Sequence, residues 1–478
     1  MMIKVKTSGA FFAVLILMLM QGKPVEAGDA YSPMYTDDPS KVFWFVHVSD
    51  LHIDTLFSGT EESFLEWVVT DCFDVVEPEF VVATGDLTDS TIGIVYGQGP
   101  LEEEWDMYRN IIDTAGMAPG VYYDIIGNHD AYGDEGASFY LSRSVTGQDQ
   151  GTTQPHWWLE LPFGTYHFLG IATTCNDWVQ WPSDNTNITS EEFDEIHANL
   201  EMDTDSRLTI AMGHHNYTTA AGGVRVDDLF AAYDVPLYIH GHEHEYGIRL
   251  SNRNVVMGRV SSLGQTVDEQ NVCFWAVDSD CISHTCFSAA APWPVVIITA
   301  PVDAMLGVND DLSNPYAPVV STECDEAPLR ILAFDAEPIT FITFEWDTGE
   351  EGEFEQSGEI DAQWQAEFDA TGFEPGIHDL TVEISGTATR QFAAQVMFSD
   401  CACNLSGEPG EGDCYEVDDF EPAAEDAPEP VAEDEEDASV DAADMVETED
   451  AQQDTAGDTD EDEDGGDVSG GGCSCRVG

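Results

Sequence analysis

Residues 43–52 read FWFVHVSDLH, a run of apolar, strand-forming residues that leads into an aspartate and a histidine. The same arrangement, an apolar run followed by side chains of metal-ligand type, returns four more times. The later copies are FVVATGD at 80–86, VYYDIIGNHD at 121–130, LTIAMGHH at 208–215 and PLYIHGHEH at 236–244. Because α/β folds place their sites at the carboxyl ends of strands, the five segments predict one shared site.

The chain between these runs has helical patterns. Apolar residues recur at helical spacing at Phe64, Val68, Cys72 and Val76. Thr189 and Glu192 form a possible capping box for a helix that continues through Met202, and residues 166–173 resemble another strand. Strands that alternate with helices are typical of layered α/β architecture, which we expect between Lys41 and about Ala290.

A second kind of pattern begins at Trp293 and continues to about Ser399. Short strand-like runs separated by turn residues occur at 295–299, 329–334, 339–346, 364–368, 378–384 and 391–398. This spacing predicts a small β-sandwich. No cluster of ligand-type residues appears in it, so we expect it to serve packing or spacing.

Charge is distributed unevenly along the chain. The net charge is −80, with 14 Lys and Arg against 94 Asp and Glu, which excludes nucleic-acid binding by a basic surface. Residues 401–478 carry 28 acidic side chains and one basic one, Arg476. We expect this segment to be a disordered, self-repelling tail, with weak divalent-cation binding as the alternative. The remaining acidity is consistent with a surface adapted to high salt, or with a generally acidic proteome.

The amino terminus predicts export. Lys4 and Lys6 precede an apolar run at 10–20 that is too short to span a bilayer, and small residues precede Gly28. The predicted organisation is a signal peptide at 1–27, an α/β domain at 28–290, a β-sandwich at 291–400 and a tail at 401–478. No later run is long enough for a transmembrane helix, so we expect a periplasmic, cell-surface or secreted protein.

Eleven cysteines in an exported chain predict disulfides. Short-loop bridges are expected within two groups, Cys273, Cys281 and Cys286, and Cys401, Cys403 and Cys414. A bridge from the second group to Cys324 is a further option. Cys72 lies on an apolar helix stripe and is interpreted as a core residue.

The five strand ends bring together carboxylate, amide and imidazole side chains, the donor set of hard and borderline metals. We expect two divalent or trivalent ions, such as Mn, Fe or Zn. Asp86 would bridge them, because one carboxylate can bind two ions. One site would contain Asp50, His52 and His244, and the other Asn128, His214 and His242. Glycines at 85, 127, 213 and 241 are expected where the backbone turns to deliver each ligand.

In this order, the motifs resemble the calcineurin-like metallophosphoesterase superfamily over residues 42–247. The resemblance implies a two-sheet sandwich flanked by helices and a binuclear centre with the same seven ligands. It also implies that His129 is not a ligand but contacts the phosphate and assists the leaving oxygen. His215 is expected to approach substrate or to pack. Asp130 and Asp134 are interpreted as a helix start and solvated loop, in preference to a supporting role at the ligands.

A narrower resemblance is to the transmembrane protein 62 family. It rests on GDLTD at 85–89, Glu104-Trp105 and WPVVIIT at 293–299. That family joins the phosphoesterase to an immunoglobulin-like domain, which is the fold that the resemblance implies for residues 291–400. It then continues into membrane spans, which this chain lacks.

The leading functional hypothesis is hydrolysis of a phosphomonoester or phosphodiester outside the cytoplasm, by attack of a hydroxide that bridges two metal ions. A non-catalytic cell-surface protein that uses the same fold for binding is the alternative. A third option is a protein that buffers divalent cations on its acidic tail. The sequence specifies neither the substrate, the metal pair, the protein partners nor the oligomeric state.

Overall fold

The computed structural model describes residues 33–55, 61–90, 100–134, 136–174, 186–265, 270–306, 312–406 and 414. All of them belong to one compact unit, Met1–Val417. The predicted signal peptide at 1–27 and nearly all of the predicted tail lie outside the described residues.

The first sheet has five strands in the order β11-β10-β1-β2-β3. Its members are β1 (Val42–Val48), β2 (Val81–Thr84), β3 (Tyr122–Ile125), β10 (Asn271–Asp278) and β11 (Cys281–Ser288). Strands β1, β2 and β3 are parallel, whereas β10 and β11 pair in antiparallel fashion at one side. β2 and β10 are buried along their whole length, as expected for a sheet covered on both faces.

The second sheet has six strands in the order β4-β5-β6-β7-β9-β8. They are β4 (His156–Leu161), β5 (Gly164–Ile171), β6 (Leu208–Gly213), β7 (Leu237–His240), β8 (Gly247–Leu250) and β9 (Val256–Arg259). The two sheets pack face to face through one apolar core that includes Phe45, Phe80, Phe168 and Ile210. Phe80 and Phe168 meet edge to face with ring centroids 4.9 Å apart.

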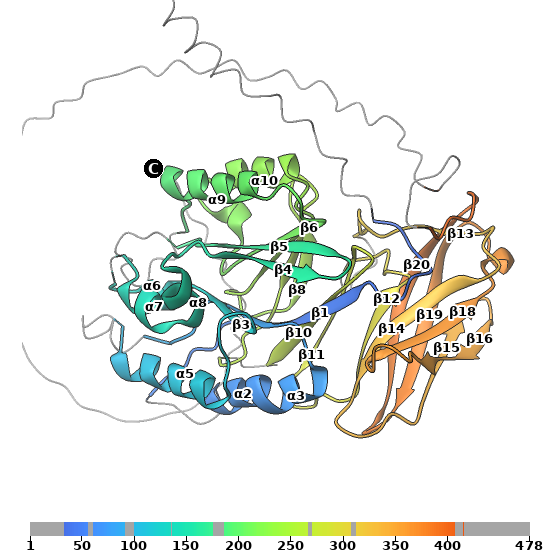
Figure 1. Cartoon of the computed structure of the whole chain (residues 1–478), viewed down its shortest axis with the longest axis horizontal. Coiled ribbons are helices and arrows are strands. Elements are labelled where there is room, and N and C mark those ends of the chain that lie inside the picture. Colours follow the sequence, from blue (N-terminus) through green and yellow to red (C-terminus); the bar gives the residue numbers. More distant parts are fainter. Residues whose placement is uncertain are drawn as a thin grey trace, which may run out of the picture. The chain divides into compact units, whose positions relative to one another are not determined.

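Helices cover the outer faces of both sheets (Figure 1). α2 (Glu61–Trp67), the π-helical turn η1 (Val68–Cys72), α3 (Phe73–Val76) and α5 (Glu102–Thr114) lie on the first sheet, and α9 (Ser190–Met202) and α10 (Gly223–Ala232) lie on the second. Short helices α6 (Asn128–Ala131), α7 (Ser138–Arg143) and α8 (Val145–Gln150) and the turn η2 (Tyr217–Thr219) complete this part. The predicted sandwich of two sheets flanked by helices is confirmed. Among the described residues, no helix is both long enough and apolar enough to cross a bilayer.

The predicted capping box at Thr189 and the predicted apolar helix stripe that includes Cys72 are both present. The capping box is present, because the Thr189 hydroxyl accepts the Glu192 backbone amide and the Glu192 carboxylate accepts that of Thr189. The apolar stripe that includes Cys72 is also buried against the first sheet. Its helix contains a π turn at Val68–Cys72, a local departure that the regular spacing did not indicate.

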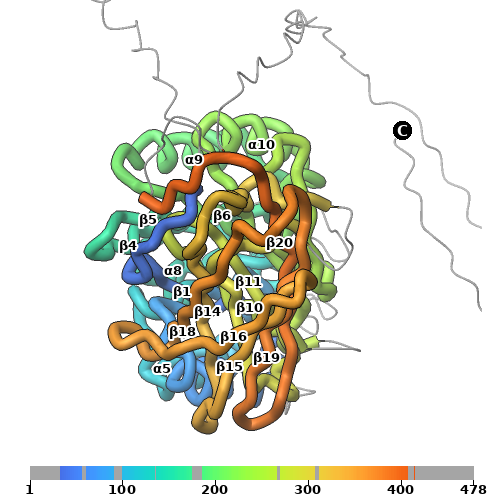
Figure 2. Tube along the Cα trace, turned by 90° about the vertical axis from the view of Figure 1, so that its right-hand side faces the viewer, coloured from blue at the N-terminus to red at the C-terminus, as the bar shows by residue number. Residues whose placement is uncertain are grey.

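The carboxyl-terminal part is a β-sandwich, which faces the viewer in Figure 2. One sheet contains β12 (Val295–Ala300), β14 (Ala327–Phe334), β17 (Glu355–Gln356) and β18 (Gln363–Phe368). The other contains β13 (Val320–Ser321), β15 (Phe341–Trp346), β16 (Glu351–Glu353), β19 (Gly376–Ser385) and β20 (Thr389–Ser399), and η3 (Ala370–Gly372) precedes β19. All six predicted strands are present. The very short strands β13, β16 and β17 were not predicted.

The β-sandwich has its own apolar core, but part of β12 and β14 packs into the core of the α/β part. Val295 and Ile297 of β12 and Phe334 of β14 belong to the same apolar cluster as β1, β2 and the helices of the first sheet. A buried ion pair lies at this junction, where the Arg330 guanidinium contacts Asp278 at 2.8 Å and 3.0 Å. Both charges are buried and paired, so loss of one partner would leave the other charge uncompensated.

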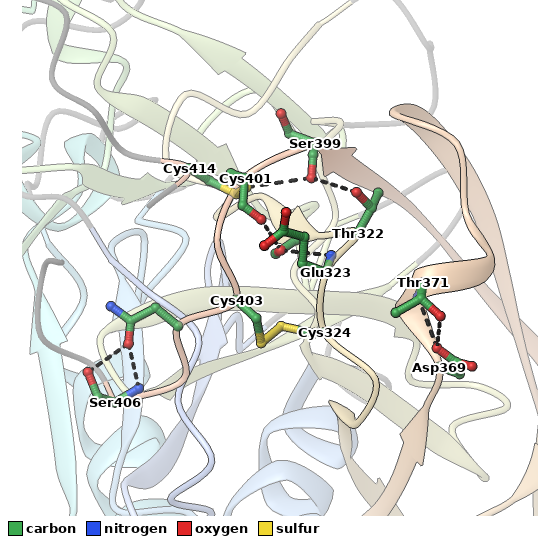
Figure 3. The surroundings of a disulfide bond; sticks show 12 residues. Thr322, Glu323, Cys324, Asp369, Thr371, Ser399, Cys401, Cys403, Ser406 and Cys414 are labelled. Atoms are coloured by element: carbon green, nitrogen blue, oxygen red, sulfur yellow. Dashed lines mark hydrogen bonds between the residues drawn. A yellow bond between two sulfur atoms is a disulfide. The ribbon is translucent and has the colours of Figure 1, made fainter. Parts of the chain in front are cut away.

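Three disulfides are present among the described residues. Cys273–Cys286 joins β10 to β11, Cys324–Cys403 ties the chain after β20 back to the β-sandwich, and Cys401–Cys414 closes a short loop within that following segment (Figure 3). Cys72 and Cys281 are buried free thiols. The bridge to Cys324 therefore exists, and one bridge lies within each predicted group.

The disulfide connectivity predicts how truncation at the carboxyl terminus changes the stability of the protein. The segment after β20 also pairs with the amino-terminal segment, since the Asp37 amide donates to the Leu405 carbonyl at 3.1 Å. A chain ending at Ser399 should lose about 4 kcal/mol of unfolding free energy, the scale for one bridge across a long loop. A chain ending at Val417 keeps both bridges and should match the full-length melting temperature by calorimetry. Equal melting temperatures for all three chains would contradict a structural role for residues 401–414.

Candidate metal centre

The ends of β1, β2, β3, β6 and β7 meet, and the loops that follow them are joined by backbone hydrogen bonds. The Asp50 amide donates to the Gly85 carbonyl at 3.0 Å, and the His52 amide donates to the Asp86 carbonyl at 2.8 Å. The Gly241 amide donates to the His214 carbonyl at 3.0 Å. These bonds hold adjacent loops in register, so side chains far apart in sequence point to one place.

One group of predicted ligands comes from the loops after β1 and β7. His244 Nε2 lies 3.2 Å from Asp50 Oδ1 and 3.1 Å from His52 Nε2. His52 Nε2 lies 3.8 Å from Asp86 Oδ2. Asp50, His52 and His244 thus offer three donor atoms close enough together to hold one ion, with the Asp86 carboxylate beside them.

Two ligands predicted for the second ion, His214 and His242, also lie close to Asp86. His214 Nε2 is 3.1 Å from Asp86 Oδ2, and the His242 ring is 5.2 Å from the His214 ring between centroids. The Asn128 amide nitrogen donates to the Tyr132 hydroxyl at 2.8 Å, which leaves the Asn128 oxygen for another partner. Asp86 Oδ2 is therefore the atom that both groups approach.

The donor atoms have the properties of a site that binds cations. Asn128 Oδ1 is buried and has no hydrogen-bond partner, which costs about 1–3 kcal/mol. Asp50 Oδ1 and His214 Nε2 are buried beside His244 and Asp86, and their closest polar neighbours are other predicted ligands. Metal ions bound between these atoms would remove that cost, and the oxygen and nitrogen donors suit divalent or trivalent ions. The residues present fit a binuclear centre.

Backbone conformation is unusual at the same place. Five of the seven predicted ligands have φ in the left-handed region, namely Asp50, His52, Asp86, His242 and His244, with φ between 45° and 74°. Such a conformation costs about 1–3 kcal/mol for a residue other than glycine. It persists only where the surroundings impose it, so its concentration here supports a functional site.

Two glycines explain how the loops approach so closely. Gly85 has φ of 98°, and a Cβ there would lie 2.6 Å from His214 Nδ1. A Cβ on Gly127 would lie 2.1 Å from the Asp86 amide, although Gly127 has no left-handed backbone. The expectation of a sharp turn thus holds for Gly85, whereas Gly127, Gly213 and Gly241 are required because other atoms lie too close for a side chain.

Charge pairs within the cluster shift several pKa values. Burial favours the neutral form of Asp50, but His214 and His244 outweigh it and lower the pKa of Asp50 to about 2. Burial likewise opposes a charged His214, yet Asp86 and Asp50 raise the pKa of His214 to about 10. The buried carboxylates are therefore stabilised by positive charge close to them. Metal ions would supply that charge and would displace the additional proton from His214 on binding.

His129 lies beside the centre rather than in either group of three. Its backbone amide donates to Asp86 Oδ1 at 2.9 Å, and its Nε2 is 3.9 Å from Asp86 Oδ2. Its Nδ1 is hydrogen bonded to the backbone carbonyl of Asp89. The side chain is 19% exposed, so Nε2 is the nitrogen that a bound substrate would approach.

Asp89 is a supporting residue that the sequence interpretation missed. Its Oδ1 lies 3.4 Å from His52 Nδ1 and accepts a hydrogen bond from Gln265 Nε2. A carboxylate on the far nitrogen of a ligand histidine orients the ring and strengthens it as a donor. The signal was available, since Asp89 follows Asp86 within the quoted GDLTD stretch.

Asp130 requires a correction. The expected helix start is present, because Asp130 lies in the first turn of α6 and its carboxylate accepts the Gly127 amide at 2.8 Å. The expected solvation is wrong, because Asp130 is fully buried and also accepts the backbone amides of Thr88 at 3.1 Å and Leu87 at 3.2 Å. It ties the loop after β2 to the loop after β3, which carry Asp86 and Asn128. Asp134 does mark a helix start, because it accepts the Phe139 amide of α7 at 2.7 Å.

His215 packs within the centre. Its Nδ1 lies 2.9 Å from the Thr173 hydroxyl, and its ring is 4.1 Å from that of His242 between centroids. Burial keeps the pKa of His215 well below its usual value, so the ring is neutral. His214, His215 and His242 also form a group with metal-binding spacing.

Comparisons with known proteins agree with this arrangement. The family model for calcineurin-like phosphoesterases matches residues 43–246. Transmembrane protein 62 of Mus musculus is 26% identical over 382 residues, which is 77% of this chain and 56% of that protein. A protein of Arabidopsis thaliana named as a metallophosphoesterase is 25% identical over 42% of this chain and 30% of its own length. The chain thus spans about half, or less, of the length of these relatives.

Solved structures with related folds include a dimetal phosphatase from Danio rerio, with TM-score 0.43 and 14% identity, covering 53% of this chain and 97% of that one. Another is a 5'-nucleotidase from Candida albicans, with TM-score 0.36 and 13% identity, covering 54% of this chain and 52% of that one. The family match covers all five strand-end segments. The chain therefore contains a calcineurin-like metallophosphoesterase domain over residues 43–246.

Proposed function

We propose that this protein is an exported phosphoesterase that hydrolyses phosphomonoesters or phosphodiesters at a binuclear metal centre. The observation that carries the proposal is the position of Asp86. Its Oδ2 lies 3.1 Å from His214 Nε2 and 3.8 Å from His52 Nε2, so one carboxylate oxygen faces both groups of donor atoms.

The residues have distinct roles in this proposal. Asp50, His52 and His244 would hold one ion, Asn128, His214 and His242 would hold the other, and Asp86 would contribute to both sites. When bound, the two ions would polarise the phosphoryl oxygens and supply a hydroxide nucleophile near neutral pH. His129 gives the proton on Nε2 to the leaving oxygen, while its Nδ1 hydrogen stays on the Asp89 carbonyl and fixes the ring.

Export is supported by the three disulfides, because such bonds persist in oxidising compartments. Cys273–Cys286 links neighbouring strands of the first sheet, Cys324–Cys403 joins the β-sandwich to the segment after it, and Cys401–Cys414 lies within that segment. We propose that the amino-terminal 27 residues direct this export and that the immunoglobulin-like interpretation of the β-sandwich holds.

The test is a substrate panel with defined metal loading. The full chain is stripped with chelator, reloaded with Mn, Fe or Zn, and assayed on phosphomonoesters, cyclic nucleotides, glycerophosphodiesters and phospholipids. We expect metal-dependent hydrolysis of at least one class, lost again on chelation. Stoichiometric metal binding without hydrolysis of any class would favour the non-catalytic binding alternative.

A further inference from the structure

A buried glutamate outside the metal centre is connected to His129 through one peptide group. Glu104, in the first turn of α5, is 1% exposed, and its Oε2 accepts the backbone amide of Ser90 at 2.9 Å. The carbonyl of that same peptide group belongs to Asp89 and accepts the hydrogen bond of His129 Nδ1. The peptide between Asp89 and Ser90 is therefore bonded at both ends.

We propose that Glu104 is a positioning residue that acts through the Asp89–Ser90 peptide to strengthen the hydrogen bond to His129 Nδ1 and to hold the Nδ1-protonated ring with Nε2 toward the reaction. The inference deepens the proposed function, since it rests on His129 as the proton donor. Nothing in the five strand-end motifs includes Glu104, which comes from a helix on the outer face of the first sheet.

Glu104 would strengthen the hydrogen bond to His129 because its charge polarises the buried peptide group between Asp89 and Ser90. A carboxylate that accepts the N–H of a peptide draws its hydrogen and increases the negative charge on the carbonyl oxygen at the other end. Glu104 and Ser90 are both buried, so water does not screen the effect. A more negative carbonyl binds the Nδ1 hydrogen more firmly and makes Nε2 a stronger base, as a carboxylate does in a histidine–carboxylate pair.

The local structure is specific for this connection. Ser90 has φ of 51°, an unfavourable conformation for a residue other than glycine, at the point where its amide is bonded to Glu104 of α5. The Thr88 hydroxyl lies 3.3 Å from the Ser90 hydroxyl and donates to Asp130 Oδ1 at 3.3 Å, which fixes the preceding residues. Burial raises the pKa of Glu104 to about 7, against the lowering effect of the Ser90 amide. Measurements made well above that pKa therefore test the charged form.

The first variant is Glu104→Gln, which keeps the size and the acceptor oxygen but removes the charge. The matched control is Glu192→Gln, because Glu192 is also buried and accepts a backbone amide, at the start of α9. We expect Glu104→Gln to keep normal metal content and to lose about tenfold in kcat on phenyl phosphate. The loss should be small on 4-nitrophenyl phosphate, whose leaving group needs little protonation. Glu192→Gln should leave both rates unchanged.

A second measurement does not require turnover. In zinc-loaded full chain labelled with ¹⁵N-histidine, the His129 ring is assigned by comparison with His129→Gln. We expect the wild-type ring to carry hydrogen on Nδ1, the nitrogen that is bonded to the Asp89 carbonyl, and its Nδ1–H proton resonance to move upfield in Glu104→Gln. Glu192→Gln should leave that resonance in place.

The outcomes separate the two proposals. If the wild type hydrolyses nothing, the proposed function fails and the ring spectrum alone decides the role of Glu104. A wild-type ring protonated on Nε2 instead of Nδ1 would overturn the inference even if Glu104→Gln failed to fold. An unmoved resonance in a folded Glu104→Gln, or an equal loss on both substrates, would also overturn it.

Discussion

Asp86→Ala should lose both metals and nearly all hydrolysis. Its carboxylate lies 3.1 Å from His214 and 3.8 Å from His52, one donor from each set, and burial leaves no water to replace it. Removal of a supporting residue behind a metal ligand costs about 10–100-fold in affinity or activity, so removal of a shared ligand should exceed 100-fold. The measurement is metal content per chain by mass spectrometry, together with initial rates.

The control for this variant is Glu243→Ala. Glu243 lies between His242 and His244 in sequence, but its carboxylate is directed to Arg249 at 3.3 Å and Arg259 at 3.2 Å. We expect it to keep near-normal metal content and rate. Equal metal content in the wild type and Asp86→Ala would contradict the assignment of Asp86 as the shared ligand.

His129→Ala should separate turnover from metal binding. The His129 ring is not a member of any metal-binding group that contains Asp50 or His214. Its Nε2 nevertheless lies 3.9 Å from Asp86 Oδ2, close enough to act on a substrate bound at the centre. We expect near-normal metal content and a loss of about 10²-fold or more in kcat, the usual contribution of a general acid. The loss should shrink for substrates with good leaving groups such as nitrophenol.

The result that would contradict this role is loss of metal together with activity. His129, Asp89 and His52 also lie within metal-binding distance of one another. A His129→Ala protein that binds fewer ions would therefore indicate that His129 is a ligand and that the proton donor is another group.

The central strands and the ligand positions could be predicted because both are local signals. Each central strand is a short apolar run, and each predicted ligand follows its strand within a few residues, so β1 and the Asp50–His52 pair are visible in ten residues of sequence. The Thr189 capping box is equally local. The structure then brings six of the predicted ligands, all except Asn128, into groups with metal-binding spacing, and His129 lies beside Asp86.

The supporting residues could not be predicted in the same way, because their roles depend on long-range contacts. Asp130 resembles a solvated acidic residue until its three backbone donors are known, two of which come from the loop after β2. Glu104 is one of three consecutive glutamates at the start of α5; the family resemblance includes it but assigns it no role, and its burial and its bond to Ser90 are known only from the structure. The shared core between β12 and the first sheet is likewise a tertiary property.

The central claim is a binuclear centre that performs hydrolysis, and a metal titration tests it most directly. Chelator-treated full chain is titrated with the metal that gives the highest rate, and bound metal and the initial rate on a responsive phosphoester are measured at each addition. We predict that hydrolysis rises with metal and saturates when two ions are bound per chain. Saturation with one bound ion, or two bound ions without hydrolysis, would contradict the account.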